Sequence, residues 1–123
     1  MPAARDDRVY LWEMLQAARE VIQFTHDRSY EAYLSDAMLR RAVERSVQII
    51  GEAARQVSET TRRRHPEIPW PRIVGQRHRV THEYYGVDHR RIWNVATEHV
   101  PALVRQLEQI VPPPPDEPPE DAT

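Results

Sequence analysis

Residues 36–57, DAMLRRAVERSVQIIGEAARQV, decide the fold of this chain. Apolar residues recur in this stretch at spacings of three and four, which is the period of an α-helix with a buried face. A main stripe and a smaller, flatter second stripe run along the same predicted helix. They consist of Leu39, Val43, Val47, Ile50, Ala54 and Val57, and of Ala42, Ser46, Ile49 and Ala53. A helix that is apolar over so wide an arc is buried on two sides.

The ends of this helix follow from the residues around it. We expect it to begin at Ser35 or Asp36 and to run to about Arg63 or Arg64. It must end before Pro66, because the residue that precedes a proline avoids the α conformation. The second stripe is expected to meet another helix closely, either within the chain or across a dimer.

A helix is also predicted on the N-terminal side. Asp6 or Asp7 can cap it, and it ends near Thr25 or His26. Its apolar face consists of Leu11, Leu15, Ala18 and Ile22. This face has the spacing expected of a helix that packs on the central one.

Two more helices are predicted on the C-terminal side. The third helix begins around Trp70, which lies between two prolines that are tolerated in a first helical turn, and it ends at Gly86. Asp88 is expected to cap the fourth helix. Pro101 lies inside that fourth helix and is expected to kink it or to split it in two.

Together these patterns predict an all-α fold, an antiparallel bundle of four to five helices in one domain that spans residues 1–111. Tyr30 and Tyr33, between the first two helices, are expected to pack at one end of the bundle. Residues 112–123 are rich in proline and acid and offer nothing to bury, so we predict a disordered tail.

Composition excludes several kinds of protein. No apolar run approaches the roughly 20 residues that a membrane-spanning helix needs, and the first ten residues are too charged for a signal peptide. We therefore expect a cytoplasmic location. The chain has no cysteine, which rules out disulfides, thiol nucleophiles and cysteine-bound zinc.

The charge is distributed unevenly along the chain. The formal net charge is −2, but four of the 19 acidic residues lie in the tail, so residues 1–111 carry 17 arginines against 15 acids. The chain has no lysine, and arginine is the better partner for phosphate. Arg62, Arg63 and Arg64 form a basic run that is most simply a solvated helix C-terminus, with a contact to RNA as the alternative.

The third helix carries the residues with the clearest chemistry. Residues 77–84 read RHRVTHEY and follow the pattern R-x-x-x-x-H-x-Y. Arg77 is in line with an otherwise apolar face, so it needs an acidic partner, a ligand phosphate or a wet cleft. His82, with an ordinary pKa of about 6.5, can exchange a proton with a ribose hydroxyl or a leaving oxygen. Arg77 can hold the phosphate between them and stabilise its transition state.

Four blocks of sequence resemble the HepT-like branch (DUF86) of the HEPN proteins. They are residues 49–54 (IIGEAA), 68–70 (IPW), 77–84 (RHRVTHEY) and 86–88 (GVD). The resemblance covers roughly residues 5–110. It implies an all-helical homodimer in which Arg77 and His82 of both subunits line one groove. It also implies a metal-independent endoribonuclease that cleaves RNA by attack of the 2′-hydroxyl.

The same resemblance implies a toxin that a nucleotidyltransferase antitoxin neutralises by attaching AMP to a tyrosine. The matching position is Tyr84, two residues after His82, and the adjacent Tyr85 is the alternative acceptor. His78 stands where this branch commonly has a small polar residue. It is either an auxiliary acid or base or, as the favoured interpretation, a polar side wall of the groove.

Two other functions are compatible with the residues. One is a noncatalytic partner of a minimal nucleotidyltransferase that binds a nucleotide or presents a substrate in the same cleft. The other is a zinc site made by His78 and His82 with Glu83 or His89, which departs from known zinc signatures. We expect no metal and no cofactor, and we expect RNA, the antitoxin and a second copy of the chain as partners.

Overall fold

The computed structural model describes residues 6–75 and 88–112, and within them every regular element is helical. The elements are α1 (Asp7–Thr25), α2 (Tyr30–Ser35), α3 (Ala37–Gln56), α4 (Glu59–Arg64), α6 (His89–Asn94), the π-helical turn η1 (Val95–His99) and α7 (Val100–Ile110). Residues 70–75 are also helical. The described part of the chain contains no strand, which agrees with the predicted all-α class.

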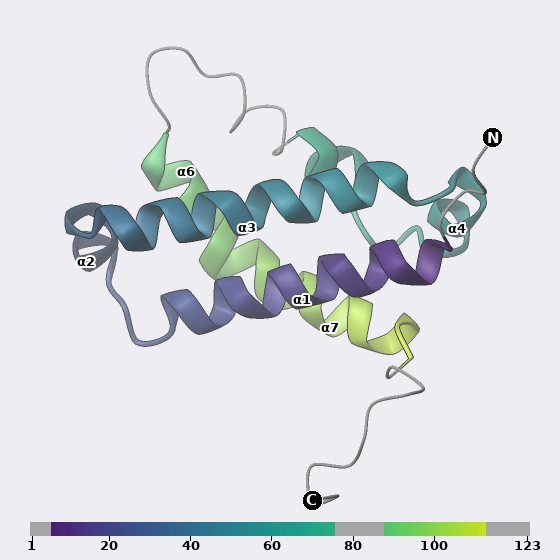
Figure 1. The fold of residues 1–123 in the computed structure, drawn as a ribbon, viewed down its shortest axis with the longest axis horizontal. Helices are drawn as coiled ribbons and strands as arrows, with labels where there is room; N and C mark the ends of the chain where they lie inside the picture. Colours follow the sequence, from purple (N-terminus) through teal and green to yellow (C-terminus); the bar gives the residue numbers. More distant parts are fainter. Residues whose placement is uncertain (1–5, 76–87, 113–123) are drawn as a thin grey trace, which may run out of the picture.

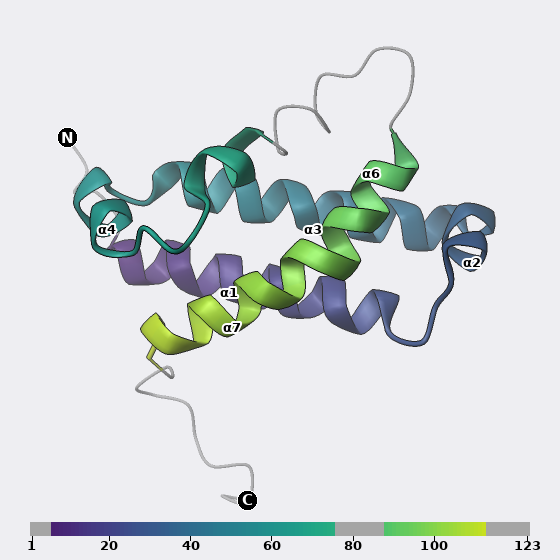
Figure 2. The same cartoon turned by 180° about the vertical axis from the view of Figure 1, so that it is seen from behind.

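Two long helices form the base of the fold (Figure 1). α1 and α3 lie side by side and run in opposite directions, and α2 and α4 sit at opposite ends of the pair. Seen from behind, α6, η1 and α7 form one continuous rod that crosses the pair obliquely (Figure 2). The core lies where these three helical segments meet.

The main apolar stripe of α3 is buried as the periodicity predicts, whereas Ile22 of α1 and Ala42 and Ile49 of the second stripe are only partly buried. All six residues of the main α3 stripe are buried, and Ser46 and Ala53 of the second stripe are buried with them. The largest fully buried side chains are Tyr33, Met14, Leu15, Ile68, Leu107, Val21 and Val43. Burying a side chain of the Leu or Val class contributes about 1.5–3 kcal/mol, so this shared core is the main source of stability.

The central helix is shorter than predicted. α3 ends at Gln56, and Val57 is extended with φ −67° and ψ 135°. Two local features explain the break. The side chain of Ser58 accepts a hydrogen bond from Thr61 N at 3.3 Å and so begins α4. Arg62 also donates from Nη2 to the carbonyls of Ala54 and Arg55, at 3.0 and 2.9 Å, which satisfies the end of α3.

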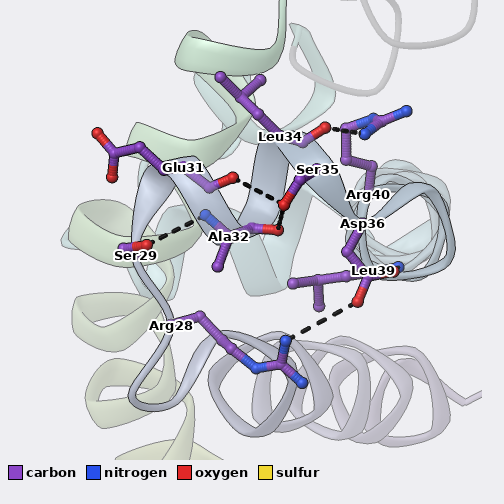
Figure 3. Close-up of polar contacts among 9 residues, drawn as sticks. All are labelled: Arg28, Ser29, Glu31, Ala32, Leu34, Ser35, Asp36, Leu39 and Arg40. Carbon is purple, nitrogen blue, oxygen red and sulfur yellow. Dashed lines mark hydrogen bonds and ion pairs between the residues drawn. The ribbon is translucent and has the colours of Figure 1, made fainter.

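The connection after α1 contains a short helix that the apolar pattern did not predict. Ser29 Oγ accepts from Ala32 N at 3.1 Å and starts α2, and Asp36 Oδ1 accepts from Leu39 N at 3.0 Å and starts α3 (Figure 3). Arg28 Nη1 lies 3.8 Å from Asp36 Oδ2, and Arg40 donates a hydrogen bond to the Leu34 carbonyl (Figure 3). These caps turn the chain sharply at this end of the bundle.

Pro101 neither splits nor ends the last helix. Proline lacks an N–H and clashes with the carbonyl four residues before it, here that of Thr97. The chain accommodates this with the five-residue π turn η1, which lies directly before α7. The predicted interruption is therefore a local widening of the helix, and the rod continues to Ile110.

Among the described residues, no helix is both long enough and apolar enough to span a membrane. This finding agrees with the absence of a long apolar run in the sequence.

A carboxylate ties the start of α1 to α4. Asp7 accepts hydrogen bonds from Ser58 N at 3.0 Å, from Ser58 Oγ at 2.5 Å and from Thr61 Oγ1 at 2.6 Å. The bonds from the Ser58 and Thr61 hydroxyls hold the pKa of Asp7 below its ordinary value of 3.8. Asp7 therefore fixes α4 and the break at Ser58 onto the first helix.

The change Asp7→Asn should lower the free energy of unfolding at pH 7 by about 1 kcal/mol, because hydrogen bonds to the charged carboxylate are weakened. The folded-state pKa is depressed, so this contribution is present above pH 3.8 and is lost as the pH falls through the lower folded-state value. Urea unfolding at several pH values measures it. Glu20→Gln, at an exposed side chain of α1, is the control and should change nothing.

Candidate functional site

The predicted site residues Arg77, His78, His82, Tyr84 and Tyr85 all fall within residues 76–87, outside the described residues. Their roles and mutual geometry stay predictions. The structure describes the two flanks of this segment, residues 70–75 before it and residues 88–94 after it. The flanks decide where the segment is attached to the bundle.

The upstream flank is fixed by a buried tryptophan. Trp70 is only 5% exposed, and its Nε1 donates to the carbonyl of His65 at 3.0 Å. Ile68, two residues earlier, is 1% exposed. Ile73 N donates to the Pro69 carbonyl at 3.1 Å, which starts the helical turn that the sequence predicts there. The chain therefore leaves the bundle toward Arg77 from a rigid base.

The downstream flank begins with the predicted cap. Asp88 Oδ1 accepts a hydrogen bond from Arg91 N at 3.1 Å and starts α6. Ile92 and Trp93 are buried in the core one turn later. The segment that carries the motif is thus attached to the core at both ends.

An aromatic cluster holds α6 against α2. The ring of Trp93 lies 5.1 Å from that of Tyr33 and 6.2 Å from that of Tyr30, centroid to centroid. The Arg90 guanidinium lies 4.2 Å from the centroid of the Tyr30 ring, a cation–π contact. The expectation that Tyr30 and Tyr33 pack at the end of the bundle is confirmed, and the cluster anchors the helix that follows the motif.

His89 completes this anchor. The centroids of the His89 and Tyr33 rings lie 6.3 Å apart in a T-shaped arrangement, and His89 Nδ1 lies 3.6 Å from Glu44 Oε1 on α3. Burial, with the nearby charge of Glu44 as the next cause, raises the pKa of Tyr33 well above its ordinary range. Tyr33 therefore stays protonated and acts by packing.

The zinc alternative uses His78 and His82 with Glu83 or His89, and of these four residues the structure describes His89. Residues 6–75 and 88–112 contain no group of three or more acidic or histidine side chains that could hold a metal ion. The contacts of His89 that the structure describes are with Glu44 and Tyr33, which supports a structural role for this histidine.

Two grooves flank the helical residues 70–75, and neither follows from the sequence pattern. One, of about 210 Å³, is mostly apolar and runs between α3 and the η1–α7 rod. Its walls include Val47, Ile50, Arg72, His99, Leu103 and Gln106. The other, of about 500 Å³, lies between the end of α3, α4 and residues 70–74 and is rich in arginine. The residues of each groove come from separate elements, so no local sequence motif predicts either groove.

Comparisons with known proteins show which sequences this chain resembles. The sequence model of one protein family, described as Ribonuclease HepT-like, matches residues 14–110. The chain is 36% identical over 104 residues to "Putative RNase MJ1380" of Methanocaldococcus jannaschii, which covers 85% of this chain and 95% of that protein. It is 34% identical over 106 residues to "Probable ribonuclease HepT" of Thermococcus cleftensis, with 86% and 96% covered.

A further relative has the same identity as the first. "Putative RNase TTE0752" of Caldanaerobacter subterraneus subsp. tengcongensis is 36% identical over 104 residues, which is 85% of this chain and 93% of that protein. No solved structure shows a significant match. The similarity therefore rests on sequence over nearly the whole length of these relatives.

The change Asp88→Ala should lower the free energy of unfolding by about 1 kcal/mol and loosen the first turn of α6, since the cap of that helix is lost. Amide hydrogen exchange should show faster exchange at Arg91, whose N–H the carboxylate accepts. Asp36→Ala removes the matching cap of α3 and should act on the Leu39 amide instead. Unchanged exchange at Arg91 would refute this role of Asp88.

Proposed function

Because the chain belongs to the ribonuclease HepT-like family, we propose that it is a metal-independent endoribonuclease whose catalytic residues are Arg77 and His82. One observation carries the proposal. The motif R-x-x-x-x-H-x-Y lies inside the residues that the family model matches, in a chain whose relatives are named as ribonucleases. RNA is accordingly the proposed substrate.

The proposed reaction needs only groups that the chain itself supplies. The imidazole of His82 takes the proton of a ribose 2′-hydroxyl, and the 2′-oxygen attacks the adjacent phosphorus. The bond from phosphorus to the 5′-oxygen breaks, and that oxygen takes up a proton as it leaves. Arg77 holds the phosphate and stabilises the negative charge that develops on it. The products are a 2′,3′-cyclic phosphate and a 5′-hydroxyl end.

A single imidazole cannot easily remove one proton and deliver another in the same step. A two-fold dimer would bring a second His82 to the same groove, so we propose that the active form is a homodimer. His78, one helical turn before His82 in the predicted helix, is proposed as a side wall of that groove.

The proposed biological role is that of a toxin with a nucleotidyltransferase antitoxin. AMP attached to Tyr84 would place bulk and negative charge beside Arg77, where it competes with the RNA phosphate for the same cation. Tyr85 is the alternative acceptor because it offers an adjacent hydroxyl. Modification would thus inhibit the enzyme, because the charge and bulk of AMP would exclude the RNA phosphate from the site.

The changes His82→Ala and Arg77→Ala should each reduce RNA cleavage by roughly 10²–10⁴-fold, because each removes a group that acts in the transition state. Cleavage by the unaltered protein should persist in excess EDTA and should leave 2′,3′-cyclic phosphate ends, which gel analysis of end-labelled RNA detects. His26→Ala, at a side chain that is 76% exposed in a helix-terminal turn, is the matched control and should cleave normally. Full cleavage by the His82 variant would end the proposed mechanism.

Incubation with the antitoxin and ATP should add the mass of AMP to the protein and abolish cleavage. The change Tyr84→Phe should prevent this addition, whereas Tyr85→Phe should not. Intact-mass measurement and peptide mapping distinguish the two hydroxyls. If the Tyr84 variant still gains AMP and the Tyr85 variant does not, Tyr85 is the acceptor. If the unaltered chain gains none, the noncatalytic-partner alternative takes precedence.

A further inference from the structure

We propose that the larger groove beside α4 binds the sugar-phosphate backbone of the RNA outside the catalytic residues. We call it the arginine groove, and its walls include Arg55, Glu59, Arg62, Arg63, Trp70 and Val74. The inference rests on the proposed ribonuclease function and adds a second contact surface for the same substrate.

Three chain segments build the groove. The last turn of α3 supplies Arg55, α4 supplies one acidic and two basic residues, and the flank of the motif supplies the apolar wall. The groove has a volume of about 500 Å³ and is open to solvent, so an extended strand can lie along it. The wall itself is rigid because Trp70 is anchored by its bond to the His65 carbonyl.

Arg62 is the fixed cation of the groove. Its Nη2 donates to the carbonyls of Ala54 and Arg55 in the last turn of α3, so this guanidinium is held in place before any ligand arrives. Its Nε is buried and has no hydrogen-bond partner among the described residues. The negative end of the α3 dipole offsets part of this charge, and Arg62 therefore acts mainly by shaping the groove.

Arg55 and Arg63 are the cations available to a ligand. Arg55 is exposed and has no ion-pair partner within residues 6–75 and 88–112. Arg63 pairs with Glu59 at 2.6 Å, but both side chains are about three-quarters exposed, at 77% and 75%. An ion pair in such high dielectric contributes little, so a phosphate can replace the carboxylate at small cost.

The charge of the groove favours a polyanion. Its walls carry three arginines against one glutamate, and the next residue along α4, Arg64, is also exposed. The aromatic residue in the wall is buried and uses its indole N–H internally, so it offers no face on which a base could stack. The groove therefore suits recognition of phosphates without recognition of sequence.

The groove also lies in the right place along the chain. Val74 forms part of its wall, and Arg77 follows three residues later. Three residues of fully extended chain span at most about 11 Å, so Arg77 can be no farther than this from Val74. A strand whose scissile phosphate is held by Arg77 can thus continue along the arginine groove.

The test measures RNA binding by the full chain in a His82→Ala background, where the substrate is not cut. The double change Arg55→Gln with Arg63→Gln should weaken binding of a 16-nucleotide single-stranded RNA roughly tenfold at 0.15 M salt. The slope of log K against log salt concentration should fall by about 1.4, or about 0.7 for each lost phosphate contact. The loss should be smaller for an RNA of about 4 nucleotides, which is too short to occupy both surfaces.

The matched control is Arg19→Gln with Arg105→Gln on the α1–α7 side of the bundle. Arg19 pairs with an exposed glutamate, Glu108, at 3.1 Å, and Arg105 is exposed, so the control repeats one paired and one free arginine. It lowers the net charge equally and should leave the salt slope unchanged. Glu59→Gln should act in the opposite direction and tighten binding roughly fourfold, a gain that misfolding cannot produce.

The outcomes separate this inference from the proposed function. If the unaltered chain cleaves RNA and the Arg55/Arg63 variant keeps the full salt slope, only the proposal that the arginine groove binds RNA is overturned. Binding of an acidic protein surface to the groove is then the alternative. Equal losses in the groove and control variants would also overturn it, because the effect would then be one of net charge. If neither the unaltered chain nor any variant binds RNA, both the RNA-binding role of the groove and the proposed ribonuclease function are refuted.

Discussion

The packing of α1 against α3 is the interaction on which the rest of the structure depends. Both helices carry apolar residues at the helical period, and their antiparallel pair leaves one face to receive the α6–α7 rod, which contacts α3 through α6 and α1 through η1 and α7. Because α3 is buried from two directions, its stripe tolerates little change in volume. Every other element is positioned by its contact with this pair.

The ends of the pair are held by polar contacts rather than by apolar burial. At one end Asp7 joins α1 to Ser58 and Thr61, and at the other the caps of α2 and α3 turn the chain within a few residues. These contacts fix where the flanks of the motif leave the bundle. Trp70 before the motif and Asp88 with the aromatic cluster after it then hold both ends of the segment that carries Arg77 and His82.

This division of labour has a functional consequence. The apolar core fixes the two attachment points, while the residues proposed to perform chemistry lie on the segment between them. The arginine groove lies beside the upstream attachment point and shares Val74 with it. The side chains proposed to contact RNA, Arg55 and Arg63, are therefore not those that form the core. They can be changed without altering the core packing.

The sequence by itself determined the all-α class, the main buried stripe of α3, most of the buried face of α1, the cap at Asp88 and the family. These are local properties, because apolar period and capping are written within a few residues of each other. It also supplied Arg77 and His82 as the proposed catalytic pair through the motif. Only the tertiary structure decided the break at Val57, the π turn before Pro101 and the groove that gathers Arg55, Arg62 and Arg63. The groove depends on which separate segments meet, whereas the break and the π turn depend on a side-chain cap and a proline clash, and a periodic apolar pattern encodes none of these.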